Sequence, residues 1–235
     1  MTSFPVTTLT GESATIDAQA VADLQTAVRG PILTANSPDY NDVRLMWNKL
    51  IDKRPALIVR ATGTADVVAT VNFARQHSIL LAVRGGGHNV AGNATCDGGI
   101  MLDLSLMTGV YIDTKKRTAH AQGGATWGDL DHETQLHGLA TPGGIVSETG
   151  IAGLTLGGGY GWLRGKHGLS CDNLVSVEIV TADGRVLSAS EGENADLFWA
   201  IRGGGGNFGV VTSFEYQLHP VGPIVNLVAA MYPNE

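Results

Sequence analysis

The stretch that decides the fold is residues 81–105, "LAVRGGGHNVAGNATCDGGIMLDLS". An apolar run leads into three consecutive glycines and a single histidine, Gly85 to His88, and the chain turns apolar again after a further glycine pair. Glycine permits positive φ angles and close approach of the backbone to a ligand. Consecutive glycines can also expose several backbone N–H groups as an anion-binding nest, which is suited to a pyrophosphate. The stretch therefore predicts two strands joined by a loop that binds a ligand.

The residues before this stretch complete a strand–helix–strand unit. "ALIVRATG" at 56–63 predicts a buried strand, a helix capped by Thr64 extends to about His77, and "ILLAV" at 79–83 predicts a second strand. Such a unit favours parallel strands with a right-handed crossover. The glycine loop then leaves the carboxyl end of the second strand, where open α/β sheets bind ligands.

The pattern changes after residue 108, where the predicted strands are joined by hairpins and are mainly antiparallel. The predicted elements are hairpins at 110–122 and 174–190, a helix at 126–138 capped by Thr126 and ended by Gly138, a short helix from Asn194, and a strand at 208–220. We therefore expect an α+β fold whose main domain, 50–220, comprises two α/β subdomains, at about 50–108 and 109–220.

The two ends of the chain are expected to lie outside this domain. Residues 1–49 predict a helical segment, from the spacing of apolar residues in 17–28 and in a helix at 39–55 that ends at a proline. Residues 221–235, "VGPIVNLVAAMYPNE", predict the first strand of another domain that is essentially absent. An unpaired strand of this kind favours association with another chain.

Composition narrows the class of protein. The 32 glycines among 235 residues cluster between apolar segments, which a bound cofactor would explain. A net charge of −7 argues against nucleic-acid binding, and no apolar run of 18 residues predicts a membrane span. The N-terminus lacks the features of a signal peptide, so we expect a cytoplasmic protein. Cys96 and Cys171 are expected to be small buried hydrophobic residues.

Other functional motifs fail on spacing or order. "GGGGNFG" at 203–209 contains G-x-G-x-x-G but follows a helix and precedes a strand, the reverse of a nicotinamide-binding unit. His132 and His137 lie five residues apart, whereas a zinc-binding HExxH pair lies four apart. Ser147 and Ser170 lack the sequence context of a hydrolase nucleophile. No metal site is predicted.

Two long motifs resemble a known family. "VRGGGHNVAGN" at 83–93 and "TPGGIVSETGIAGLTLGGGYGWL" at 141–163 are similar to the FAD-binding (PCMH-type) domain of the vanillyl-alcohol oxidase / p-cresol methylhydroxylase superfamily, and most similar to its berberine-bridge-enzyme-like oxidases. Further similarity in 168–174 and 198–216 extends the resemblance over about residues 40–220.

The resemblance implies a set of FAD-binding residues from three parts of the chain. They are Arg84, Gly85, Gly86, Gly87, His88, Asn89, Gly92 and Asn93 from the first motif, Pro142, Gly143, Ser147, Thr149, Gly150, Gly153, Gly157, Gly158, Gly159, Gly161 and Trp162 from the second, and Val211 from the last strand.

The resemblance also implies how the cofactor is held. His88 matches the histidine that bonds covalently to the 8α-methyl carbon of the flavin, and a neutral imidazole nitrogen is a suitable nucleophile for that carbon. Many relatives have a second link to a cysteine, which here aligns with Val146. Since valine cannot form the bond, a single histidyl link is expected.

The function implied is that of a flavin-dependent oxidase, which takes a hydride from a small-molecule substrate and is reoxidised by O2. In the family, a second domain supplies the catalytic base and the substrate contacts, so this chain is expected to carry the FAD-binding half alone. The alternatives are a non-catalytic flavin-binding module and one half of a two-chain assembly.

Overall fold

The computed structural model describes residues 3–226, 228 and 230–232 and contains two main sheets. The first sheet has four strands in the order β3-β4-β6-β5. Its strands are β3 (Ile32–Leu33), β4 (Leu57–Arg60), β5 (Leu81–Arg84) and β6 (Ile100–Asp103). Both β4 and β5 run parallel to β6, which lies between them, so the predicted strand–helix–strand unit spans a central third strand.

The second main sheet has five strands in the order β11-β10-β12-β8-β7, and all of its pairings are antiparallel. Its strands are β7 (Val110–Asp113), β8 (Thr118–Gln122), β10 (Leu174–Val180), β11 (Val186–Ser190) and β12 (Val210–Gln217). The predicted hairpins at 110–122 and 174–190 are confirmed. Two smaller pairs join β1 (Ser3–Thr7) to β2 (Ser13–Asp17) and β9 (Leu139–Ala140) to β13 (His219–Pro220).

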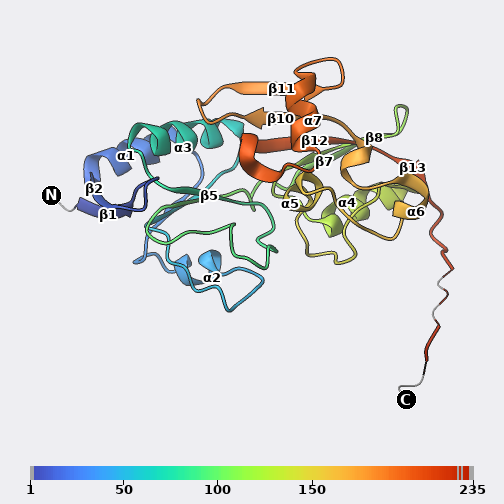
Figure 1. Ribbon diagram of the computed structural model, residues 1–235, viewed down its shortest axis with the longest axis horizontal. Coiled ribbons are helices and arrows are strands. Elements are labelled where there is room, and N and C mark those ends of the chain that lie inside the picture. Colours follow the sequence, from blue (N-terminus) through green and yellow to red (C-terminus); the bar gives the residue numbers. More distant parts are fainter. Residues whose placement is uncertain (1–2, 227, 229, 233–235) are drawn as a thin grey trace.

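Helices connect and cover these strands (Figure 1). The α-helices are α1 (Ala18–Ala27), α2 (Tyr40–Arg44), α3 (Thr64–Gln76), α4 (Trp127–Thr134), α5 (Ile151–Leu156), α6 (Arg164–His167) and α7 (Ala195–Ile201). Short 3-10 turns are η1 (Gln135–His137), η2 (Cys171–Asn173) and η3 (Gly205–Phe208). The expected cap at Thr126 is confirmed as a capping box with Asp129, and Gly138 ends η1 with φ +64°.

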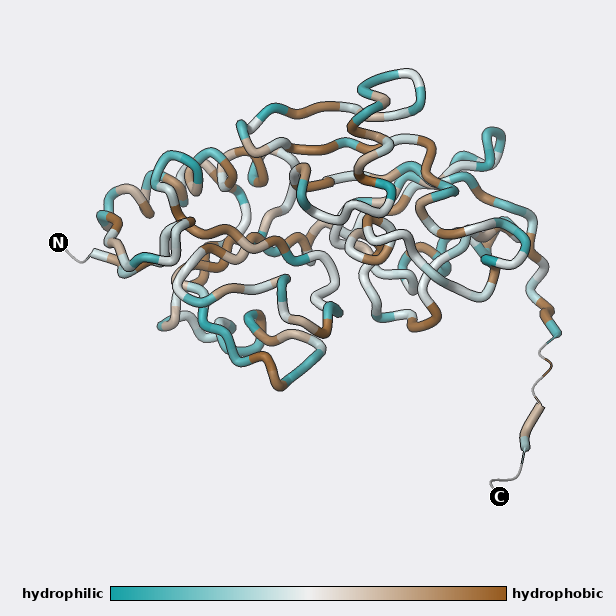
Figure 2. Tube along the Cα trace, in the orientation of Figure 1, coloured by the Kyte–Doolittle hydropathy of each residue, from teal (hydrophilic) through white to brown (hydrophobic). Residues whose placement is uncertain are grey.

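The interior consists of apolar clusters that match this division. Hydrophobic residues concentrate on the strands in the middle of the molecule, and polar residues on the outer loops (Figure 2). One buried cluster lies between the antiparallel sheet, α4 and α5 and includes Trp127 and Tyr216. A second lies around α3 and the parallel strands, and it takes in Val180 and Val210 from the antiparallel sheet. The two sheets therefore share part of one core.

The N-terminal segment differs from the helical prediction. Strands β1 and β2 form a hairpin before α1, and the helix expected at 39–55 is limited to α2. Thr64 does not cap α3, because Gly63 occupies the cap position and the Thr64 hydroxyl binds Glu178 instead. The residues after α2 do not continue the helix because they bind the glycine loop, as the Trp47 N–H does at the Gly87 carbonyl.

The predicted strand at 221–235 is not found among the described residues of that segment. Residues 221–226, 228 and 230–232 form no strand, and Ile224, Val228 and Met231 are almost fully exposed. The other residues of this prediction, 227, 229 and 233–235, lie outside the described residues. The described residues of this segment therefore offer no unpaired strand edge through which another chain could associate.

Candidate functional site

The glycine loop begins where β5 ends and has a backbone rich in free donors. Within the part of the chain that the structure describes, the N–H groups of Gly85, Gly86, Gly87 and His88 donate no hydrogen bond. Gly87 has φ +66°, a left-handed conformation in the middle of this run. Since buried or half-buried N–H groups are nearly always paired in proteins, four consecutive free donors can receive an anion such as a phosphate.

The loop touches the second glycine-rich motif through backbone alone. A Cβ atom on Gly86 would lie 2.4 Å from the Gly150 nitrogen, and a Cβ atom on Gly150 would lie 2.4 Å from the Gly86 nitrogen. Neither position can hold a side chain without moving the other segment. The structure therefore brings the two predicted motifs together, and the glycine at 86 is required by chain packing as well as by any ligand.

A third segment, between β8 and α4, joins this contact. A Cβ atom on Gly85 would meet the Gly123 oxygen at 3.2 Å, and one on Gly123 would meet the Val211 oxygen at 2.5 Å. Val211 itself is buried in β12. Val211 was expected to contact the cofactor from the last strand. The structure places its carbonyl against Gly123, which in turn contacts the loop and which sequence reasoning did not single out.

The part of the second motif before α5 packs on an indole. A Cβ atom on Gly143 would lie 2.2 Å from the Trp127 ring, and one on Gly161 would lie 1.6 Å from the Gly143 oxygen. Pro142, next to Gly143, is buried, whereas Ser147 is exposed. These contacts bring Gly143 and Gly161 together and fix the loop that runs to Gly150.

The remaining predicted site residues are exposed or make contacts within the chain. Gly158 and Gly159 accept hydrogen bonds from the backbone of Cys171 and Ser170, which fastens the turn after α5 to η2. Trp162 is 74% exposed. Asn93 and Asn89 are exposed, Thr149 is half-buried and binds the Trp127 N–H through its carbonyl, and Gly92 is buried.

The side chain of Arg84 makes contacts away from the glycine loop. Its guanidinium lies 3.8 Å from the buried carboxylate of Asp103 and donates to the Val43 carbonyl. Asp103 is also paired with Arg60 at 3.0 Å. The Arg84 side chain is therefore turned toward β6 and α2, and only its backbone leads into the loop.

Helix α5 presents an open glycine. A Cβ atom on Gly153 would meet no atom of the chain within 4 Å, and one on Gly157 would make only ordinary contacts. Gly153 in α5 and Gly157, which caps its C-terminal end, are exposed, while Ile151, Ala152 and Leu156 of the helix are buried. One face of α5 is therefore packed in the core, and the other is a flat surface next to the glycine loop, suited to a large planar group.

His88 is held against Trp47, a residue that the sequence did not bring forward. The two rings stack with centroids 4.5 Å apart and planes 22° apart. The imidazole Nε2 is buried and has no hydrogen-bond partner among the described residues. Buried ring nitrogens are rarely left unpaired, so a group outside the chain is expected to meet this atom.

Residues 47–53, which follow α2, contact the glycine loop at several positions. The Trp47 N–H donates to the Gly87 carbonyl at 3.1 Å, and the Asn48 amide donates to the Val90 carbonyl at 3.0 Å. Lys53 donates to the Gly92 carbonyl at 3.0 Å, and Ile51 packs on Gly92. No signal in the sequence marks these contacts, because the apolar residues of 39–55 keep a spacing compatible with a helix.

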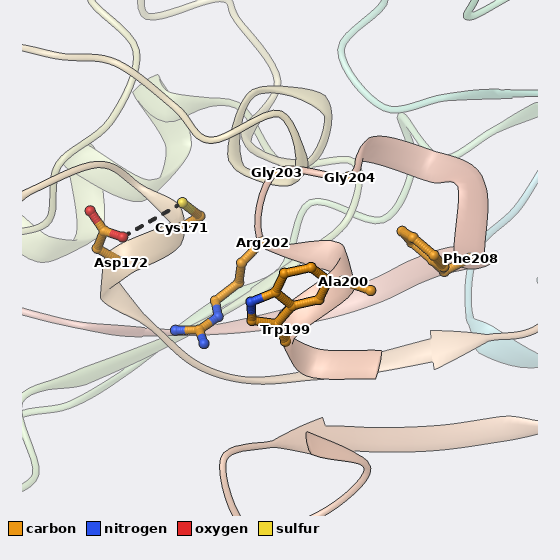
Figure 3. A pocket seen from close by; sticks show the side chains of 8 residues that line it. All are labelled: Cys171, Asp172, Trp199, Ala200, Arg202, Gly203, Gly204 and Phe208. Atoms are coloured by element: carbon orange, nitrogen blue, oxygen red, sulfur yellow. Dashed lines mark hydrogen bonds between the residues drawn. The ribbon is translucent and has the colours of Figure 1, made fainter. Parts of the chain in front are cut away.

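A separate pocket of about 490 Å³ lies at the end of α7 (Figure 3). Its lining residues are Cys171, Asp172, Trp199, Ala200, Arg202, Gly203, Gly204 and Phe208. None of them was predicted as a site residue. Burial is the main cause that raises the pKa of the Cys171 thiol, with Asp172 adding to it, so the sulfur stays protonated and is a poor nucleophile.

The remaining cysteine and the candidate metal ligands add no reactive centre. Cys96 is buried, and burial raises the pKa of its thiol to about 11, which confirms the expectation of small buried cysteines. Among the described residues there is no cluster of three or more His, Cys, Asp or Glu side chains that could hold a metal ion. In the same part of the chain, no helix is long and apolar enough to span a membrane.

Comparison with known proteins gives a consistent match. Residues 55–190 match the model of a family described as FAD binding domain. The chain is 40% identical over 216 residues to an FAD-linked oxidoreductase of Aspergillus terreus, an alignment that covers 91% of this chain and 44% of that protein.

Solved structures agree with this match. 6-Hydroxy-D-nicotine oxidase from Arthrobacter nicotinovorans has a TM-score of 0.81 at 41% identity, covering 82% of this chain and 43% of that one. A BBE-like protein of Physcomitrella patens has a TM-score of 0.80 at 30% identity, covering 85% and 44%. The α+β fold of a PCMH-type FAD-binding domain is thereby confirmed. The chain spans about half the length of the curated relatives it matches.

Proposed function

Because the chain belongs to the FAD binding domain family, we propose that it is the cofactor-binding part of a flavin-dependent oxidase, which removes a hydride from a small-molecule substrate and delivers the electrons to O2. The relatives are named FAD-linked oxidoreductases and oxidases, which supports the redox class. Bound FAD would supply the hydride acceptor. The observation that carries the proposal is the run of free N–H groups beside the unpaired Nε2 of His88.

The N–H groups of Gly85 to His88 would bind the pyrophosphate of FAD. They are consecutive, free of partners within the described chain, and turned by the positive φ of Gly87. A pyrophosphate accepts several hydrogen bonds at once, and charge-assisted bonds of this type are stronger than neutral ones. The contacts of the loop with Trp47, Asn48 and Lys53 hold this cradle in shape.

The exposed face of α5 would lie along the cofactor. Gly153 and Gly157 leave the helix backbone uncovered, so a flat group can approach without meeting a side chain. The backbone contact of Gly86 with Gly150 places the start of α5 beside the pyrophosphate cradle. Together the two motifs form one continuous binding surface.

His88 would hold FAD covalently. An imidazole nitrogen of His88 would give up its proton and bond to the 8α-methyl carbon, which would lose one hydrogen. Bound FAD would itself take up the two hydrogens and the electron pair so released, with O2 as the final oxidant. The link would involve His88 alone, since Val146, at the position where the resemblance implies a second link, is exposed but cannot form a bond.

Two substitutions test the two roles. His88→Ala removes the nucleophile but leaves the cradle, so we expect FAD that is bound yet released by acid denaturation, whereas wild-type protein retains a flavin mass on the His88 peptide. Gly153→Val covers the open face of α5 and should abolish FAD binding. The measurements are the flavin content of purified protein and the mass of the His88 peptide.

Gly165→Val is the matched control for Gly153→Val. Gly165 is also an exposed helical glycine whose Cβ would meet no atom within 4 Å, but it lies in α6. Both variants carry the same cost of valine in a helix. Loss of FAD in both variants, or in neither, would contradict the proposed contact, and a flavin mass retained in His88→Ala would contradict the proposed link.

A further inference from the structure

The indole of Trp47 covers one face of the His88 imidazole and leaves the rest of its own ring free. The rings are stacked at 4.5 Å, and Trp47 is 53% exposed. Trp47 belongs to the connection after α2, forty-one positions before His88 in the chain, so the contact is made by the fold and not by local sequence. We propose that Trp47 is a positioning residue, which holds the imidazole of His88 in the orientation that attaches FAD.

Hydrogen bonds from the segment after α2 already fix the position of the glycine loop, so the indole of Trp47 is not needed for that purpose. The Trp47 N–H binds the Gly87 carbonyl, and Asn48 and Lys53 bind the carbonyls of Val90 and Gly92. These three bonds involve no atom of the indole. Replacing the Trp47 side chain therefore leaves the cradle anchored and removes only the ring that faces His88.

The imidazole lacks the usual means of orientation. A reacting histidine is commonly held by a hydrogen bond to one ring nitrogen while the other nitrogen reacts. Here neither ring nitrogen forms a hydrogen bond within the described chain, and Nε2 is buried as well. Stacking on Trp47 is the contact that restricts rotation about the side-chain bonds of His88, and it leaves the ring nitrogens free to form a bond.

This inference rests on the proposed function and predicts an effect on attachment that is separate from binding. Orientation of a nucleophile changes the rate of bond formation, whereas affinity for FAD depends on the pyrophosphate cradle and on α5. Loss of the stacked ring should therefore slow attachment even when the site is saturated with FAD.

The experiment follows attachment in apoprotein produced under riboflavin limitation. FAD is added at saturating concentration, samples are denatured at intervals, and flavin fluorescence that stays with the polypeptide is measured. We expect Trp47→Leu to attach FAD about tenfold more slowly or worse, and Trp47→Phe, which keeps a flat ring, to stay close to wild type. Trp199→Leu, which changes a Trp that is 75% exposed and lies in α7, should have the wild-type rate.

The affinity for FAD, measured with the attachment step blocked by His88→Ala, separates the possible results. The proposal holds if Trp47→Leu in that background binds FAD as tightly as His88→Ala alone. Equal attachment rates in Trp47→Leu and Trp47→Phe, or a loss of affinity large enough to account for the slower rate, would overturn it. If wild type itself attaches no FAD, the covalent part of the proposed function fails, and this inference fails with it.

Discussion

Glycines at the candidate site are required for different physical reasons, and the structure separates them. Gly86 and Gly150 permit two backbones to touch, whereas Gly153 leaves a surface open. From the sequence alone, all three were expected to contact a cofactor. A pattern of glycines predicts that something approaches the backbone, but whether that is a ligand or another segment depends on the tertiary structure.

Gly86→Ala should destabilise the protein even without FAD. The new Cβ would lie 2.4 Å from the Gly150 nitrogen, and overpacking of this kind costs about 1–3 kcal/mol. Gly63→Ala is the control, because a Cβ there meets no atom within 4 Å and the residue has an extended conformation. Urea unfolding of the two apoproteins measures the difference. If Gly86→Ala unfolds at the wild-type midpoint and loses only FAD, the backbone contact described here is wrong.

Trp47 shows what residue patterns could not predict. The glycine loop was recognisable because a run of glycines before one histidine is unusual in itself. Trp47 lies among residues compatible with a helix, and its contact with His88 exists only once the chain has folded. The glycine loop was therefore predictable from the sequence, and its contact with Trp47 was not.

At the scale of elements, one carboxylate joins α3 to the segment that follows α1. Asp66 lies in the first turn of α3 and is 3% exposed. It accepts hydrogen bonds from the backbone N–H groups of Arg29, Gly30 and Thr62 and from the Thr62 hydroxyl. Burial alone would raise its pKa, but these four bonds together outweigh burial and lower it.

Asp66→Asn should cost about 2 kcal/mol or more at neutral pH, since the amide cannot accept all four bonds. The pKa is lower in the folded than in the unfolded protein, so the stabilisation is complete above the unfolded value of about 4 and is lost as the pH falls through the folded value. Urea midpoints at pH 7 and in the acid range measure this. A variant whose stability falls with acid as steeply as that of wild type would show that Asp66 is not responsible.

The type of an element was predicted correctly where local sequence determines it, and incorrectly where tertiary contacts outweigh local sequence. The hairpin at 174–190 follows from alternating residues around an Asp-Gly turn, and the structure has it. The helix expected at 39–55 is cut short at Arg44, because the following residues bind the glycine loop instead of one another. The hairpin of β1 and β2 was missed because its strands are short and because Pro5 argues against a strand in β1.

On the scale of the whole molecule, the parallel and antiparallel sheets meet at the start of α3. Glu178 of β10 accepts a hydrogen bond from the Thr64 hydroxyl at 2.6 Å and another from the Thr212 hydroxyl of β12 at 2.6 Å. Val180 and Val210 extend the same junction into the core around α3. The glycine loop follows one sheet and α5 packs on the other, so the relative position of the sheets shapes the proposed FAD site.

Glu178→Ala should therefore weaken both folding and FAD binding. Hydrogen bonds to a charged group contribute about 1.5–3 kcal/mol, and the coupling between Glu178→Ala and Thr64→Val in a double-mutant cycle should reach about 1 kcal/mol. Glu215→Ala is the matched control, because Glu215 binds Ser176 within the antiparallel sheet alone and should show no coupling to Thr64→Val. The measurements are urea unfolding of the single and double variants and FAD affinity in the His88→Ala background. Because Glu178 contacts α3 and Glu215 does not, FAD affinity should fall for Glu178→Ala and not for Glu215→Ala. Equal losses, or no coupling to Thr64, would mean that apolar packing around α3 holds the sheets together and that this carboxylate does not set the geometry of the site.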